Sequence, residues 1–138
     1  MSTSPNRVLG IFFGVIYLVA GICGFFLTSS ITFTGASGAF LIGLFEVNPL
    51  HNLIHIVAGV VLLLAALVST RTAKLANTGL GAIFLIVGII GLFVASSGNP
   101  LNILALNAAD NVLNFATAVV LLAVGLGADK AAPAPKTV

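Results

Sequence analysis

The stretch GVIYLVAGICGFF at residues 14–26 decides the fold, because it recurs as GAIFLIVGIIGLF at residues 81–93. Seven of the thirteen aligned positions are identical, and three of those seven are glycine. A second alignment pairs residues 48–63 with residues 107–122, where two asparagines and the run VVLL recur at the same spacing. The sequence therefore predicts two copies of one helical hairpin that run in the same direction.

The composition places these hairpins in a membrane. Of the 138 residues, 59% are hydrophobic and 6% are charged, whereas soluble domains carry about 25% charged residues. A spanning helix needs about 20 mostly apolar residues. Such runs lie near residues 8–27, 49–68, 75–95 and 111–127. We therefore expect an all-α integral membrane four-helix bundle, built from two parallel repeats of a helical hairpin, as one domain at residues 1–128.

The distribution of charge predicts the orientation in the membrane. The five lysines and arginines lie at the amino terminus, in a predicted turn at residues 69–74 and in the carboxyl-terminal tail. The two longer connections carry only Glu46 and Asp110. By the positive-inside rule, both termini are expected in the cytoplasm, with the chain in the inner membrane of a bacterial cell. Residues 129–138 are expected to form a disordered cytoplasmic tail.

The same numbers limit the possible partners. A net charge of +2 without a basic stripe excludes nucleic-acid binding. The expected partners are the lipid bilayer and either other membrane subunits or further copies of the chain.

The glycines of the first and third predicted helices lie on one face of each helix, at 100° per residue. They are Gly10, Gly14, Gly21 and Gly24 in the first helix and Gly81, Gly88 and Gly91 in the third. Membrane helices associate through close packing, and small residues permit that approach. We expect these faces to form helix contacts, either inside the bundle or with a second chain.

Polar residues gather at the outer ends of the second and fourth predicted helices. The predicted cluster consists of Asn48, His51, Asn52, His55, Asn107, Asp110, Asn111 and Asn114. Polar side chains at this depth are costly and usually turn inward to find partners. We expect His51, His55 and Asp110 to meet as one inward-facing group near the outer membrane surface.

Three interpretations of this cluster stay open. The residues can be structural, with asparagines capping helix starts and the histidines bonded to Asn111 and Asn114. They can hold a metal ion or a haem, since His51 and His55 lie one helical turn apart and Asp110 and Glu46 offer carboxylates. They can also relay protons or pass a small solute. The last interpretation is weakened by the inner half of the bundle, where no ionisable residue lies between His55 and Arg71.

The connection at residues 28–47 contains the apolar stretch 39–45, which is too short to span a membrane. We expect this stretch to lie on the bundle or in the membrane interface and to cap the outer mouth.

The segment NPLHNLIHIVAG at residues 48–59, with ADNVLN at residues 109–114, resembles the membrane-protein family catalogued as domain of unknown function 4383. The likeness extends from Arg7 to Gly127. It implies a four-helix bacterial membrane protein, typically actinobacterial, without an established activity. The family motif histidine-asparagine-x-x-histidine falls on His51, Asn52 and His55. The family often has a third histidine where this chain has Asn114. A more distant resemblance links the four spans to small DoxX-type membrane proteins.

Motifs typical of catalysis, such as a nucleophile elbow or a phosphate-binding loop, are absent from the sequence. We therefore expect no enzymatic activity and no catalytic residues. The first hypothesis for function is a non-catalytic accessory or assembly subunit of a membrane complex or homo-oligomer, without a cofactor. The alternative is a small transporter, or a redox protein with a metal ion or haem at His51 and His55.

Overall fold

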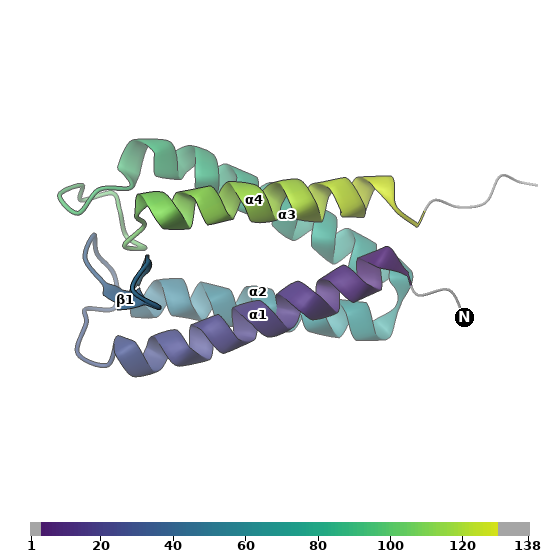
Figure 1. Cartoon of the computed structure of the whole chain (residues 1–138), viewed down its shortest axis with the longest axis horizontal. Coiled ribbons are helices and arrows are strands. Elements are labelled where there is room, and N and C mark those ends of the chain that lie inside the picture. The colour runs from purple at the N-terminus through teal and green to yellow at the C-terminus, as the bar shows by residue number, and fades with distance from the viewer. Residues whose placement is uncertain (1–3, 130–138) are drawn as a thin grey trace, which may run out of the picture.

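A computed structural model describes residues 4–129 of the chain (Figure 1). The elements are α1 (Pro5–Leu27), β1 (Ala39–Leu41), β2 (Phe45–Val47), α2 (Pro49–Val68), α3 (Thr70–Val94) and α4 (Ala108–Gly127). All four helices of the described region are long and apolar enough to cross a membrane. The expected all-α membrane bundle is confirmed, with a small antiparallel sheet added between the first two helices. The protein is thus a multi-pass membrane protein.

Side-chain caps determine where the helices begin. The side chains of Ser4, Asn48, Ser69 and Asn107 each accept a hydrogen bond from the backbone N–H three residues later. Such a cap satisfies a donor that the first turn otherwise leaves unpaired. The caps extend the helices outward, so α1, α3 and α4 begin three to five residues before the predicted starts.

The predicted turn at residues 69–74 is wrong. Ser69 alone connects α2 to α3, and Arg71 and Lys74 lie in the first turns of α3. Ser69 and Thr72 form a capping box, in which each side chain accepts from the other residue's backbone N–H. Long basic side chains can extend from a helix end into water, which allows the helix to include them.

The bundle consists of two hairpins, α1 with α2 and α3 with α4, and the predicted glycine faces lie inside them. A Cβ added at Gly14 would stand 2.9 Å from the backbone nitrogen of Leu63 and 3.1 Å from the carbonyl oxygen of Gly59. A Cβ at Gly81 would stand 3.1 Å from the backbone nitrogen of Leu122. The glycines therefore allow close helix contacts within each hairpin.

The buried positions follow the two sequence alignments. The buried residues of α1 run from Asn6 to Gly24, and each has a buried counterpart 67 positions later in α3. The buried residues of α2 recur in the same way 59 positions later in α4. At the centre, Tyr17 stacks on its counterpart Phe84 with ring centroids 5.0 Å apart. The two hairpins thus bury residues at matching positions, the glycines within each hairpin and Tyr17 and Phe84 between the two.

A set of polar residues, here called the terminal clasp, joins the start of α1 to the end of α4. Asp129 Oδ2 accepts hydrogen bonds from Ser4 Oγ at 2.7 Å and from Asn6 Nδ2 at 2.9 Å. Asn77 Nδ2 of α3 donates to Asn6 Oδ1 at 2.9 Å. Asp129 was expected to start the disordered tail, and it instead contacts α1. Residues 130–138 of the predicted tail lie outside the described residues.

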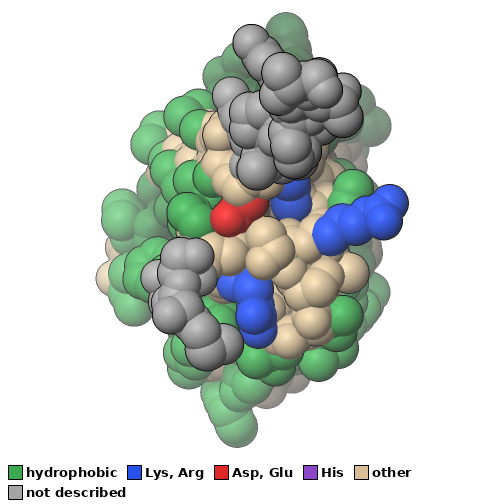
Figure 2. Space-filling model, turned by 90° about the vertical axis from the view of Figure 1, so that its right-hand side faces the viewer, with side chains coloured by type: hydrophobic (Ala, Val, Ile, Leu, Met, Phe, Trp, Pro, Cys, Tyr) green, Lys and Arg blue, Asp and Glu red, His purple; other side chains and the backbone are tan. Residues whose placement is uncertain are grey.

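The end of the molecule that carries this clasp also carries basic side chains (Figure 2). Lys74 Nζ donates to the carbonyl oxygen of Ala128 at 3.0 Å, and Arg7 Nε donates to that of Ala66 at 2.7 Å. The sheet and the loop before α4 lie at the opposite end (Figure 1). The two ends of the bundle therefore differ in charge.

Candidate functional site

A β-hairpin covers the end of the bundle opposite the termini. Strands β1 and β2 pair through Ala39–Val47, Phe40–Glu46 and Leu41–Phe45. Ile42 and Gly43 in the turn have φ values of 48° and 74°, and Leu44 N donates to Leu41 O at 3.1 Å. Two successive positive φ values are typical of the tight turns that join paired strands. The expected cap over this mouth is present, but its strand structure was not predicted.

The helix caps also fasten the outer loops to the opposite half of the molecule. Asn48 Nδ2 donates to the carbonyl oxygen of Ile103, in the loop before α4, at 2.8 Å. Asn107 Nδ2 donates to the carbonyl oxygen of Leu44, in the β-hairpin, at 2.9 Å. Asn48 and Asn107 of the predicted cluster therefore hold loops rather than line a site.

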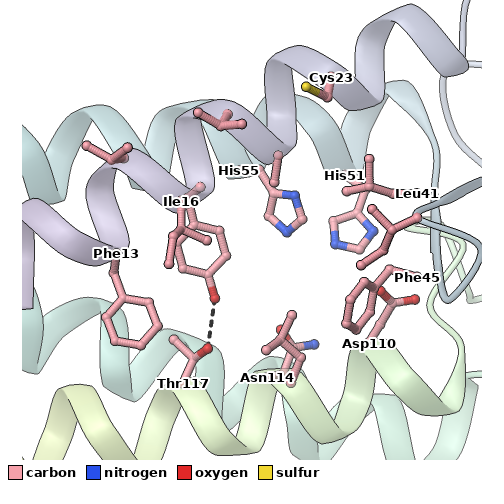
Figure 3. Close-up of a pocket in the computed structure, with 16 residues that line it drawn as sticks. Phe13, Ile16, Cys23, Leu41, Phe45, His51, His55, Asp110, Asn114 and Thr117 are labelled. Carbon is pink, nitrogen blue, oxygen red and sulfur yellow. Dashed lines mark hydrogen bonds between the residues drawn. The ribbon is translucent and has the colours of Figure 1, made fainter.

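Below the β-hairpin, between α1 and α4, lies a cavity of about 520 Å³, here called the outer pocket (Figure 3). Its lining includes Phe13, Ile16, Tyr17 and Ala20 of α1, Leu41 and Phe45 of the β-hairpin, His51 and His55 of α2, and Asp110, Asn114 and Thr117 of α4. The accessible surface of the pocket is almost entirely apolar. Val15 and Val19 at its edge are about half exposed, so the pocket opens toward the surrounding lipid.

Four members of the predicted cluster share this pocket: His51, His55, Asp110 and Asn114. Asn52 and Asn111 do not line it, because each lies one position further around its helix and faces the neighbouring helix of its own hairpin. Their side-chain oxygens occupy the places where Gly24 and Gly91 would carry a Cβ. These two glycines explain how α1 and α3 accommodate an amide.

Most polar groups around the pocket are bonded within the protein. His51 Nδ1 lies 3.0 Å from the carbonyl oxygen of Leu104. The same oxygen of Asp110, Oδ2, accepts from the backbone nitrogens of Asn107 at 2.9 Å and Glu46 at 3.2 Å. The hydroxyls of Tyr17 and Thr117 lie 2.9 Å apart. These bonds connect the two hairpins and their loops. No bond between a histidine and Asn111 or Asn114 was found among the described residues.

Two polar atoms of the pocket residues are buried without a partner among the described residues, namely His55 Nδ1 and Asn114 Nδ2. His55 and Asn114 are 8% and 6% exposed. The His55 ring lies against those of His51 and Tyr17, with centroids 4.4 Å and 5.2 Å away. Packing therefore holds His55 in place without a hydrogen bond to Nδ1.

Three of the four predicted metal ligands line the outer pocket. Within residues 4–129, no group of three or more histidine, cysteine, aspartate or glutamate side chains is placed to hold a metal ion. The Glu46 carboxylate instead accepts from Gly38 N at 2.9 Å. His51, His55 and Asp110 share the pocket, but the fourth predicted ligand is directed elsewhere.

The inner side of the pocket is closed by an apolar core. Beyond the Tyr17–Thr117 pair lie the buried side chains of Leu62, Phe84 and Leu121. Tyr17 was missing from the predicted cluster, although it is the chain's one tyrosine and aligns with Phe84. That difference between the two halves was the available signal for a cross-hairpin contact.

Comparison with known proteins gives one family and no individual relative. No curated protein and no solved structure matches the chain. A family model, described as "Domain of unknown function (DUF4383)", matches residues 7–127. This match covers all four helices, the outer pocket and the histidine motif. The chain therefore belongs to the DUF4383 family of membrane proteins.

Proposed function

We propose that the protein is a non-catalytic accessory or assembly subunit, which works in the plane of the membrane within a larger complex or a homo-oligomer. The observation that supports this proposal is that most polar groups around the outer pocket form hydrogen bonds within the protein. Tyr17, His51 and Asp110 are bonded to groups of the protein itself. These bonds join α1 to α4 and tie α2 and α4 to the loops, so they give the three residues a structural role in the bundle.

The described residues also suggest where partners contact the protein. Outside the four helices they form only short connections, of which residues 28–48 are the longest. Large apolar side chains such as Phe12, Val57 and Leu64 cover the helix surfaces and are more than half exposed. Partners would therefore meet the protein mainly through its lipid-facing helices. The glycine faces do not add to this argument, because they contact helices of the same chain.

The alternative functions receive less support. A solute path would have to cross the apolar layer of Leu62, Phe84 and Leu121 below the pocket. A redox centre at His51 and His55 would need further ligands from outside the described cluster.

The proposal places the chain in the inner membrane of a bacterial cell, with both termini in the cytoplasm. The basic residues near the terminal clasp support this orientation. In a Cys23→Ala background, a membrane-impermeant maleimide added to intact cells should label Ser37→Cys and Ser97→Cys but not Thr70→Cys. Labelling of position 70 from outside would refute the orientation.

Native mass spectrometry of the full chain, extracted in mild detergent, tests the subunit role. We expect a homo-oligomer or a complex with a second membrane protein that persists on purification. A strictly monomeric species without any protein partner, obtained also from lipid nanodiscs, would overturn the proposal.

A further inference from the structure

Five buried side-chain atoms in the described region have no hydrogen-bond partner, and two of them point to a ligand. The other three are the side-chain oxygens of Asn52, Asn77 and Asn111. Each of these oxygens lies against a glycine of α1 or α3, namely Gly24, Gly10 and Gly91 respectively. These contacts place the three oxygens between packed helices, and none of the three residues lines the outer pocket.

His55 Nδ1 and Asn114 Nδ2 differ from those three oxygens in their surroundings. Both residues line the outer pocket, and both are more than nine-tenths buried. Leaving a polar group unpaired in a buried place is costly, and an unmatched group in a native structure calls for a partner. The side chains of these two residues come from equivalent positions of α2 and α4 and point into one cavity (Figure 3).

The lining of the pocket limits the chemistry of that partner. The walls are apolar side chains such as Phe13, Leu41 and Phe45, which suit a hydrocarbon chain or ring. No lysine or arginine of the described residues lines the pocket, so a phosphate or carboxylate head would lie there without a counter-charge. The amide of Asn114 can donate or accept, and a neutral imidazole offers one donor and one acceptor. A carbonyl or hydroxyl oxygen is therefore the group that fits.

The opening of the pocket agrees with a ligand that arrives from the bilayer. Val15 and Val19 form part of its edge on the lipid-facing side of α1. Ile42, at the tip of the β-hairpin, also lines the pocket and is 81% exposed. Its positive φ is unfavourable for a β-branched residue, so the turn holds an apolar side chain at the mouth against its backbone preference.

We infer that the outer pocket binds an uncharged lipid, whose carbonyl or hydroxyl group hydrogen-bonds to Asn114 and His55 while its apolar part lies between α1 and α4. The oxygen can come from the glycerol esters and hydroxyl of a diacylglycerol or from the ring of a polyprenyl quinone. The inference does not depend on the proposed subunit role, because all residues that line the pocket belong to one chain.

Titration of the purified full chain in phosphatidylcholine nanodiscs tests the inference. The probes are dioleoylglycerol, a polyprenyl quinone, and dioleoyl phosphatidylglycerol as the anionic control. Native mass spectrometry reports bound mass, and the thermal unfolding midpoint should rise with probe concentration. We expect one equivalent of at least one neutral probe to bind in preference to the anionic lipid. The probe that binds identifies the source of the oxygen.

Two variants connect that binding to the pocket. Asn114→Leu removes the donor while keeping similar volume, and should weaken binding by about tenfold or more. Ala20→Phe fills the pocket from α1 and should weaken binding by a similar factor, which provides a test if Asn114→Leu does not fold. Ile22→Phe is the matched control, since Ile22 is exposed and outside the lining.

Three results would overturn the inference: no binding of either neutral probe, binding of the anionic lipid as tight as theirs, or unchanged binding in Ala20→Phe. The bound mass separates this result from the subunit role, because a protein partner and a lipid differ greatly in mass.

Discussion

The α1–α2 hairpin and the α3–α4 hairpin bury matching positions but place different groups at the level of the outer pocket. His51 and His55 of α2 correspond to Asp110 and Asn114 of α4. Tyr17 corresponds to Phe84, and its partner Thr117 corresponds to Ala58. The contact between α1 and α4 therefore carries a hydroxyl pair, whereas the equivalent positions in α3 and α2 are apolar. Matching buried positions with unlike side chains thus place a few polar groups around a largely apolar pocket on one side of the bundle.

The largest expected effects concern the glycine contacts, tested at one glycine in each hairpin, at positions that are not equivalent in the alignment. Gly14→Leu should destabilise the protein by about 3 kcal/mol or more, because the new side chain meets the backbone of Leu63 and Gly59. Gly88→Leu should cost about 1 to 3 kcal/mol, since it meets the ring of Phe115 at 3.2 Å, and a side chain can move. Thermal unfolding in detergent measures both.

Val15→Leu is the control for this comparison, because Val15 is half exposed toward lipid. Equal stability of the wild type and the Gly14→Leu variant would remove the close-contact argument for the first hairpin.

Removing the hydroxyl pair would make positions 17 and 117 as apolar as their counterparts, Phe84 and Ala58. Tyr17→Phe should lower stability by about 1 to 2 kcal/mol, because Thr117 then keeps a buried hydroxyl without its partner. Adding Thr117→Val should recover most of that loss, since both polar groups are then gone. A double-mutant cycle measures the coupling, and simple additivity of the two changes would show that the bond does not contribute.

The same substitution at both histidines should separate their roles. His51→Asn should cost about 1 kcal/mol, because it loses the bond to the carbonyl oxygen of Leu104. His55→Asn should cost less than His51→Asn, because Nδ1 of His55 has no hydrogen-bond partner among the described residues to lose. Denaturation of the two variants side by side checks this order, and a larger loss at His55 would contradict it.

The smallest expected effect concerns the pH dependence of stability, through Asp129, whose carboxylate holds the start of α1. The hydrogen bonds from Ser4 and Asn6, with a smaller contribution from the charge of Lys74, hold the pKa of Asp129 below its ordinary value of 3.8. A carboxyl with a lowered pKa in the folded state stabilises it above the unfolded value and loses that contribution as pH falls through the folded pKa. Stability should therefore decline slightly more steeply below about pH 4 in the wild type than in Asp129→Asn.

Unfolding midpoints measured between pH 7 and pH 3 would show this difference. Identical acid profiles for the wild type and Asp129→Asn would mean that the clasp does not respond to protonation. Ser69 caps α3 without an ionisable partner. We therefore expect no comparable pH dependence from the start of the second hairpin.

The four spans were predictable because length and hydropathy alone determine which segments can cross a membrane. The start of α2 was predicted correctly, but those of α1, α3 and α4 were not, because caps such as the Ser69–Thr72 box depend on a few hydrogen bonds. The β-hairpin was missed for a related reason. A short apolar run such as residues 39–45 has no clear period, and the only turn signal was Ile42-Gly43, where an isoleucine precedes the glycine.

The pocket was predictable in part. His51, His55, Asp110 and Asn114 lie on facing sides of α2 and α4 because helical periodicity places them there. Asn52 was grouped with them as a polar neighbour, although a single residue step turns it by 100° toward Gly24. Helical periodicity could not predict the terminal clasp, because Asn6 contacts residues 71 and 123 positions away in the chain.

The terminal clasp brings Ser4 and Asp129 within hydrogen-bond distance, and this proximity allows the two ends of the bundle-forming chain to be joined. A short flexible linker from residue 129 to residue 4, with new ends opened in the loop at residues 96–99, would give a circular permutant in which α4 comes first and α3 last. No helix would change direction, and the linker would lie outside the bilayer beside Ser69. We expect the permutant to form the same bundle with its helices in a different order along the chain. In that case the contacts between neighbouring helices determine the fold, and the order of synthesis does not.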